Sequence, residues 1–166
     1  MTSLRVFTRG FTLIELLVVI AIIGILSSVV LASLNTARNK GVDAAVKTNL
    51  GEARGQAELF YDANNFHYVG TAGTVDDVCF SGASVGGVRG IYGSVSFAGT
   101  SSGGSPTVAM TGSPSSPTEA ACHADMTAWA ASAPLRHQVN MYYCVDSTGI
   151  ATVTPNVLPA GQLYCS

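Results

Sequence analysis

Charged residues are scarce in this chain, and their scarcity excludes several classes of protein. Asp, Glu, Lys and Arg make up 11% of the 166 residues, and residues 90–118 contain none. The formal net charge is −2, a sign that does not attract nucleic acid or anionic lipid. Few charges combined with many Gly, Ser, Thr and Ala residues favour a loop-rich extracellular β domain over a helical cytosolic enzyme.

Cysteine is absent from the first 78 residues, and the chain has no CxxC pair. An even number of cysteines confined to one region predicts two disulfides formed in an oxidising compartment. Three pairings are possible, and we favour Cys144–Cys165 with Cys79–Cys122, because the first pair would tie the C-terminal end to a nearby strand. The alternative is that all four are free buried thiols.

Motifs for catalysis and metal binding are also missing. The sequence has no GxSxG elbow and no Gly-rich phosphate loop, and its three histidines (His67, His123 and His137) show no metal-ligand spacing. Cys122-His123-Ala124-Asp125 resembles a ligand cluster, but adjacent strand residues point to opposite faces and Cys122 is better used in a disulfide. Asp76-Asp77 fits a solvated loop better than a calcium site. We therefore expect no enzyme activity, no cofactor and no metal.

Against this background stands one long apolar run. From Phe11 to Leu34 the only charged residue is Glu15. As a helix these residues would extend about 36 Å, enough to cross a bilayer. A carboxylate facing lipid is costly, so by default it indicates function. The run is open to three interpretations: a signal peptide cut near Ala32, a plain membrane anchor, or a segment retained after a cut at Gly10.

The string RGFTLIELLVVIAIIGIL resembles the class III signal of type IV prepilins and pseudopilins, over about residues 5–40. In that family a membrane aspartyl peptidase removes a short charged leader that ends in Gly, and the new N-terminal residue is N-methylated. The resemblance implies cleavage between Gly10 and Phe11, methylation of Phe11, and an assembly role for Glu15.

Simple electrostatics supports the role that the resemblance gives to Glu15. Cleavage would create a cationic amine at Phe11, and the amine of a neighbouring subunit is a natural partner for Glu15 inside an apolar helix bundle. The alternative is that Glu15 reaches the membrane interface or bonds to its own N-terminus. Gly24 is our candidate for close helix packing or local flexibility within the span.

Topology follows from the cysteines and not from the flanking charges. Arg5 and Arg9 before the span are balanced by Arg38 and Lys40 after it. The cysteines place the C-terminal part outside the reducing cytosol. We expect a single-pass precursor in the cytoplasmic membrane, with the leader inside and the head outside, and a mature form in an extracellular filament.

The helix is expected to continue beyond the apolar run and to end near residues 62–65, about 50 residues in all. Its second half carries one apolar stripe at spacings of three or four, with charged residues such as Asp43, Arg54 and Glu58 at other positions. The stripe consists of Val42, Val46, Leu50, Ala53, Ala57, Phe60 and Tyr61. This half should therefore pack against the rest of the chain.

The remaining residues predict an antiparallel sheet, which makes the fold α+β and pilin-like. Strand signals lie at 94–97, 107–111, 127–131, 139–145 and 150–154, with Asp146–Gly149 as a hairpin turn. Four segments result: a cleaved leader (1–10), a transmembrane and assembly half-helix (11–34), an amphipathic half-helix (35–63) and a β-rich, disulfide-containing head (64–166).

The function expected from this resemblance is a structural subunit of a type IV pilus-like filament. Its expected partners are other pilin subunits, the prepilin peptidase, an inner-membrane platform protein and an assembly ATPase; no nucleic acid is expected. A pseudopilin of a type II secretion system shares the same N-terminus and stays open. From another class, a monomeric membrane-anchored adhesion or sugar-binding module also fits the composition.

Overall fold

The computed structural model describes residues 10–71, 74–105, 107–110, 113 and 116–166. Of the predicted leader, only Gly10 falls within the described residues. The chain forms two compact units, Met1–Arg38 and Asn39–Ser166.

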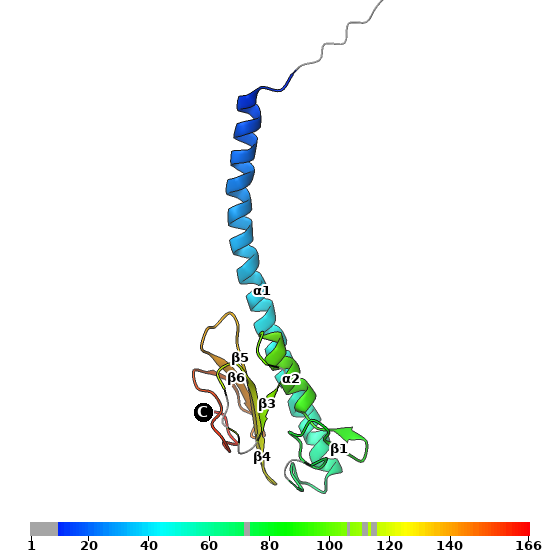
Figure 1. Cartoon of the computed structure of the whole chain (residues 1–166). Coiled ribbons are helices and arrows are strands. Elements are labelled where there is room, and N and C mark those ends of the chain that lie inside the picture. The colour runs from blue at the N-terminus through cyan, green and yellow to red at the C-terminus, as the bar shows by residue number, and fades with distance from the viewer. Residues whose placement is uncertain (1–9, 72–73, 106, 111–112, 114–115) are drawn as a thin grey trace, which may run out of the picture. The chain divides into compact units, whose positions relative to one another are not determined.

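One helix, α1 (Leu13–Ala63, 51 residues), runs through both units (Figure 1). The predicted continuous helix of about 50 residues is thereby confirmed. The helix ends where the sequence predicted, because Asn65 and Phe66 adopt left-handed backbone angles, with φ of 55° and 61°. Non-glycine residues adopt such angles rarely, and they cannot continue a right-handed helix.

The apolar stripe of α1 is the face that packs within the second unit. Val46, Leu50, Ala53, Ala57 and Phe60 are fully buried, and they form one cluster with residues of the sheet. Val42 and Tyr61, at the two ends of the stripe, are half-buried. The stripe predicted from its spacing is therefore the packed face of the helix.

Asp43 departs from its predicted place among the exposed polar positions. It is 6% exposed, and its Oδ1 accepts the backbone N–H groups of Arg136 and His137 at 2.6 and 3.1 Å. A turn before a strand leaves backbone donors without a ladder partner, and a buried carboxylate satisfies them.

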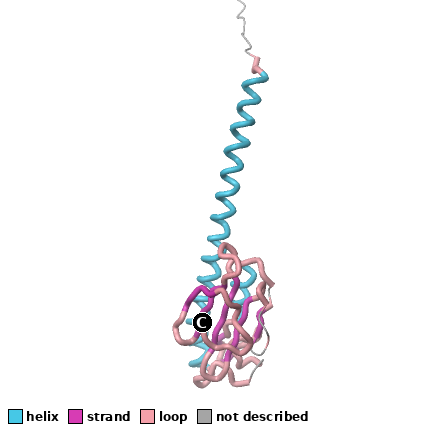
Figure 2. The backbone as a smooth tube through the Cα atoms, turned by 90° about the vertical axis from the view of Figure 1, so that its left-hand side faces the viewer, coloured by secondary structure: helices cyan, strands magenta, loops and turns pink. Residues whose placement is uncertain are grey.

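The main sheet has five strands in the order β3-β4-β5-β6-β7 (Figure 2). They are β3 (Val108–Met110), β4 (Ala120–Ala124), β5 (Trp129–Pro134), β6 (Tyr142–Asp146) and β7 (Ala151–Thr154). A separate two-stranded ribbon joins β1 (Ser84–Val85) and β2 (Val88–Arg89). The sheet is antiparallel as predicted, except that β3 pairs with β4 in parallel.

The predicted strand at residues 94–97 is wrong, because this segment lies within helix α2 (Tyr92–Ser101). Val95, Ala98 and Gly99 are buried at helical spacing, and α2 packs on β3, β4 and β5. A Cβ on Gly99 would lie 3.0 Å from the Ala120 side chain, so α2 and β4 could keep this close contact with a larger residue only by moving slightly apart. Tertiary packing thus overrides the local strand preference.

The other strand predictions differ in their boundaries, and the two short strands β1 and β2 and one strand of the main sheet, β4, were missed. The signal at 150–154 corresponds to β7, whereas those at 127–131 and 139–145 correspond to β5 and β6, which begin two and three residues later. The signal at 107–111 covers β3, and its last residue lies outside the described part. Strand β4 escaped prediction because three of its five residues are alanine, which has little strand preference. The predicted turn at 146–149 is present, with Gly149 at φ 99°.

The two faces of the sheet have different coverings. The face that carries Cys122, Trp129, Ala131 and Val145 packs against α1 and α2. The opposite face carries Ala121, Ala130 and Cys144, and it packs against Leu158 and Cys165 of the C-terminal segment. One disulfide lies on each face: Cys79–Cys122 and Cys144–Cys165, the pairing that the sequence favoured.

Candidate functional site

The N-terminal motif surrounds the start of α1. Gly10 and Phe11 are exposed and precede the helix, and Thr12 occupies the N-cap position. The Glu15 carboxylate accepts the Thr12 backbone N–H at 2.9 Å and its hydroxyl at 2.7 Å, while the Glu15 N–H donates to Thr12 Oγ1 at 3.2 Å. This reciprocal arrangement is a capping box. Within a single chain, Glu15 therefore bonds to the start of its own helix.

The apolar run is not covered by any of the residues that the structure describes. Every residue from 10 to 38 is exposed, and α1 is the described helix long and apolar enough to cross a membrane. Two hydroxyls in this stretch donate to carbonyls of their own helix: Ser28 to Ile25 at 2.7 Å and Thr36 to Ala32 at 3.3 Å. A Cβ added to Gly24 would meet nothing within 4 Å. The backbone polar groups of this segment are satisfied within the helix and its apolar surface is exposed, as a lipid or helix-bundle environment requires.

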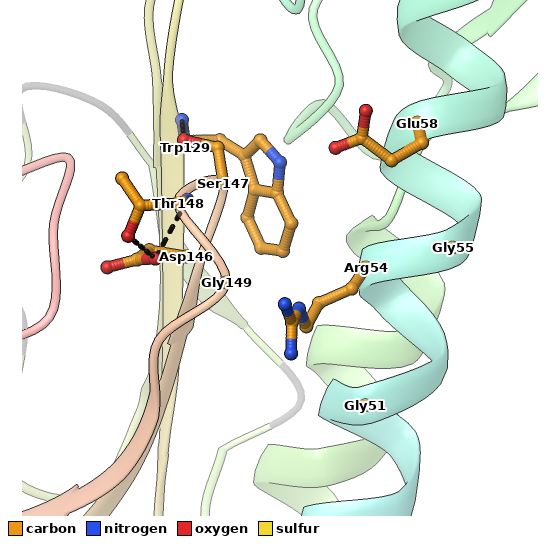
Figure 3. Close-up of a pocket in the computed structure, with 9 residues that line it drawn as sticks. All are labelled: Gly51, Arg54, Gly55, Glu58, Trp129, Asp146, Ser147, Thr148 and Gly149. Carbon is orange, nitrogen blue, oxygen red and sulfur yellow. Dashed lines mark hydrogen bonds between the residues drawn. The ribbon is translucent and has the colours of Figure 1, made fainter.

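A second candidate site is a cleft of about 480 Å³ between α1 and the β6–β7 turn (Figure 3). Four residues of α1 and five from the sheet side line it: Gly51, Arg54, Gly55, Glu58, Trp129, Asp146, Ser147, Thr148 and Gly149. Figure 3 shows Arg54 reaching toward Gly149, and the Trp129 indole nitrogen on the ring side that faces α1. This cleft was not predicted from the sequence. The feature that could have indicated it is the pair Gly51 and Gly55, two glycines four residues apart on α1.

Trp129 and Arg54 bring two hydrogen-bond donors to the lining of the cleft. The Trp129 side chain is fully buried, and its indole N–H lies next to the Tyr68 hydroxyl. The Tyr68 hydroxyl donates to Glu58 at 2.8 Å; burial and this bond to a carboxylate raise the pKa of Tyr68. Arg54 makes no hydrogen bond or ion pair within the described part of the chain. The cleft therefore carries both a cation, Arg54, and a carboxylate, Glu58, on its α1 side.

Asp146 closes the sheet side of the cleft and points away from α1 (Figure 3). Its Oδ1 accepts the Thr148 N–H at 3.0 Å, the Thr148 hydroxyl at 2.7 Å and the Ile150 N–H at 3.1 Å. Its Oδ2 accepts the Cys165 N–H at 2.9 Å. Burial acts to raise the pKa of Asp146, but these hydrogen bonds outweigh it and hold the pKa below its usual value.

We predict that Asp146→Asn destabilises the chain by about 1–3 kcal/mol at neutral pH, because an amide cannot accept all four bonds. Since the folded-state pKa is lowered, the stabilisation is complete above the unfolded pKa of about 3.9 and is lost as the pH falls through the folded value. Guanidinium unfolding of the full chain in detergent, followed by Trp129 fluorescence, measures this. The difference in unfolding free energy between the wild type and Asp146→Asn should disappear at acid pH. A difference that does not depend on pH would contradict this stabilising role of the Asp146 carboxylate. Asp62→Asn, at an exposed position, is the control.

The residues considered for metal binding serve other purposes. Cys122 forms a disulfide, and His123 is buried on the opposite face of the sheet, where burial lowers its pKa. Asp77 is 2% exposed and accepts the Cys79 N–H at 2.9 Å, so the prediction of a solvated loop was wrong for this residue. No group of three potential metal ligands occurs among the described residues.

Comparison with known proteins bears on the N-terminal motif. Residues 7–31 match the family model described as the prokaryotic N-terminal methylation motif. Over 57 residues the chain is 46% identical to the type IV wide pilus major component PilA4 of Thermus thermophilus. The aligned part is 34% of this chain and spans 44% of that relative, which is less than half its length. No solved structure matches the chain.

The observed fold agrees with these similarities. A long N-terminal helix begins in the motif, and its C-terminal part packs against a mainly antiparallel sheet that carries two disulfides. The chain thus carries the methylation motif, is similar over 57 residues to a type IV pilus component, and has a pilin-like α+β architecture.

Proposed function

We propose that this chain is a subunit of a type IV pilus-like filament, made as a membrane-anchored precursor with residues 64–166 outside the cytoplasm. The observation that carries the proposal is an apolar helical surface over residues 13–34, exposed throughout, that begins within a methylation motif. An apolar surface of this size needs lipid before assembly and neighbouring helices afterwards. The pilus component among its relatives favours a pilus over a secretion pseudopilus.

The proposed processing step is cleavage between Gly10 and Phe11 by a prepilin peptidase, followed by N-methylation of Phe11. Both residues are exposed and lie before the first helical residue, Leu13. Backbone outside a helix has no internal hydrogen bonds to break when it enters a protease cleft, and Gly10 adds no side chain to crowd it. Cleavage there leaves the whole of α1 on the mature chain.

Assembly then supplies Glu15 with a charged partner. We propose that the Phe11 amine of one copy pairs with Glu15 of the next, inside a bundle of α1 helices. In a low-dielectric bundle an unpaired carboxylate is strongly unfavourable, whereas a paired one fixes the axial register of the helices. The bonds to Thr12 hold Glu15 in place until that exchange. A platform protein and an assembly ATPase complete the proposed machinery.

Mass spectrometry of the mature N-terminus tests this proposal directly. We expect a chain that begins at methylated Phe11. A chain that retains Met1 would instead support a plain membrane-anchored module, and a chain that begins near Ser33 would support an exported domain. Either of these two results would contradict the proposed processing.

A further inference from the structure

The turn between β5 and β6 is fixed to α1 a short distance beyond the apolar run. The buried Asp43 carboxylate accepts the backbone N–H groups of Arg136 and His137. Asp43 follows Leu34, the last residue of the apolar run, by nine residues, and α1 is continuous between them. In a helix this separation is about 14 Å. Figure 1 shows the β5–β6 turn at the end of the second unit at which α1 enters it.

The β5–β6 turn presents cations and an apolar side chain to solvent. Residues 136–140 are all exposed. Val139 is 75% exposed, which makes it the most exposed large hydrophobic side chain described in the second unit. The Arg136 guanidinium lies beside Gly103, just after the end of α2. An exposed apolar side chain next to cations is typical of a segment that contacts a membrane surface.

Acidic groups are scarce at this end of the second unit. Residues 126–145 include no Asp or Glu, and Asp43 is buried in its bonds to the turn. Glu119 precedes β4 at the same end of the sheet, where it accepts the Thr107 hydroxyl at 2.8 Å. Lys40 is exposed on α1, and the exposed acids of the second unit's part of this helix lie further along it: Glu52, Glu58 and Asp62. The chain is acidic overall, but its exposed charge next to the apolar run is positive.

We propose that the β5–β6 turn contacts the outer surface of the membrane in the anchored precursor. Val139 lies at the boundary between headgroups and acyl chains, and Lys40 and Arg136 bind the phosphates of anionic lipids. This inference rests on the proposed membrane anchoring of the chain. The headgroup layer extends about 5–8 Å beyond the hydrocarbon, and long cationic side chains reach further towards it. The contact holds the second unit against the membrane until assembly removes α1 from the lipid.

Fluorescence quenching by brominated lipid tests the position of the turn. Val139→Trp in the full chain places an indole on the turn, whereas Trp129 is fully buried and gives a constant background. In vesicles that contain brominated phosphatidylcholine, most of the added emission should be lost. Ile150→Trp is the matched control, because Ile150 is exposed and its turn lies beside Arg54, eleven residues beyond Asp43 on α1. Equal quenching at the two positions, or no quenching of Val139→Trp, would overturn the proposal.

Removal of the cations tests the role of anionic lipid. With the share of brominated lipid held constant, vesicles completed with phosphatidylglycerol should quench Val139→Trp more strongly than vesicles completed with phosphatidylcholine. Adding Lys40→Gln and Arg136→Gln should weaken the contact by about tenfold or more and remove this difference. Arg89→Gln, at an exposed cation of β2, should leave the difference unchanged.

The absence of any difference between the two vesicles would overturn the proposal, and so would a difference that persists without both cations. If the double substitution disturbs the fold, Lys40→Gln alone takes its place, because Lys40 is exposed on a regular helix. A smaller fall in quenching is then expected, and unchanged quenching would again overturn the proposal.

Failure of this inference can be told apart from failure of the proposed function. If the full chain does not stay with the vesicles after a carbonate wash, the membrane anchoring fails, and the proposed function fails with it. If the chain stays with the vesicles while Val139→Trp is not quenched, only the contact of the turn with the membrane fails.

Discussion

Replacing Glu15 with alanine is expected to abolish filament formation while leaving precursor processing largely intact. In the proposed bundle, Glu15 is the one carboxylate within the apolar run, and it pairs with the Phe11 amine of a neighbouring copy. Without it the amine stays unpaired in an apolar environment, and the register between subunits is lost. Electron microscopy of filaments, together with mass spectrometry of the membrane fraction, measures the two effects separately.

The structure makes a second variant necessary, because Glu15 also caps α1. Thr12→Ala removes the hydroxyl that bonds to Glu15 and accepts its N–H, yet it keeps the carboxylate. If Glu15 acts through assembly, Thr12→Ala should still form filaments. Glu15→Gln should fail like Glu15→Ala, because it keeps the shape and lacks the charge. A normal filament yield from Glu15→Ala would contradict the assembly role of Glu15. If Thr12→Ala lost filaments to the same extent, Glu15 would act only by capping α1.

The second large effect is expected from the disulfides. Their cysteines lie 43 residues apart for Cys79–Cys122 and 21 apart for Cys144–Cys165. In the chain-entropy description, loops of these lengths correspond to about 4 and about 3 kcal/mol of stabilisation. We therefore expect Cys79→Ser/Cys122→Ser to destabilise the chain by about 0.6 kcal/mol more than Cys144→Ser/Cys165→Ser.

Guanidinium unfolding of each full-length double variant in detergent measures this difference, with Trp129, the single tryptophan, as the probe. The wild-type chain with and without reducing agent is the control, and reduction should destabilise it by more than either double variant alone. If removing either pair left the unfolding midpoint unchanged, the disulfides would not contribute to the stability of the second unit.

Local sequence patterns predicted those parts of the fold that depend on neighbouring residues. The stripe from Val46 to Phe60 has helical spacing, and the structure buries it. The turn at Asp146–Gly149 carries its glycine at the position that needs a positive φ. These features follow from periodicity and backbone sterics, which a short stretch of sequence specifies.

Predictions failed where distant residues decide the conformation. Residues 94–97 have strand preference, yet they form part of α2 because their buried face fits against β4. Strand β4 is too rich in alanine to be recognised locally, and it forms because β3 and β5 flank it. Asp43 is polar by type and lies on a charged helix face, but it is buried because the turn at Arg136 and His137 needs an acceptor.

The sequence by itself determined the N-terminal segment of this protein, residues 10–34: Gly10 before Phe11, a long apolar helix, and one carboxylate within it. Those features are local, because hydrophobicity along a single helix requires no tertiary partner. The cleft was decided by the tertiary structure alone. Residues 51–58 of α1, Trp129 and the 146–149 turn are far apart in sequence, and they meet because the apolar stripe of α1 packs on the sheet.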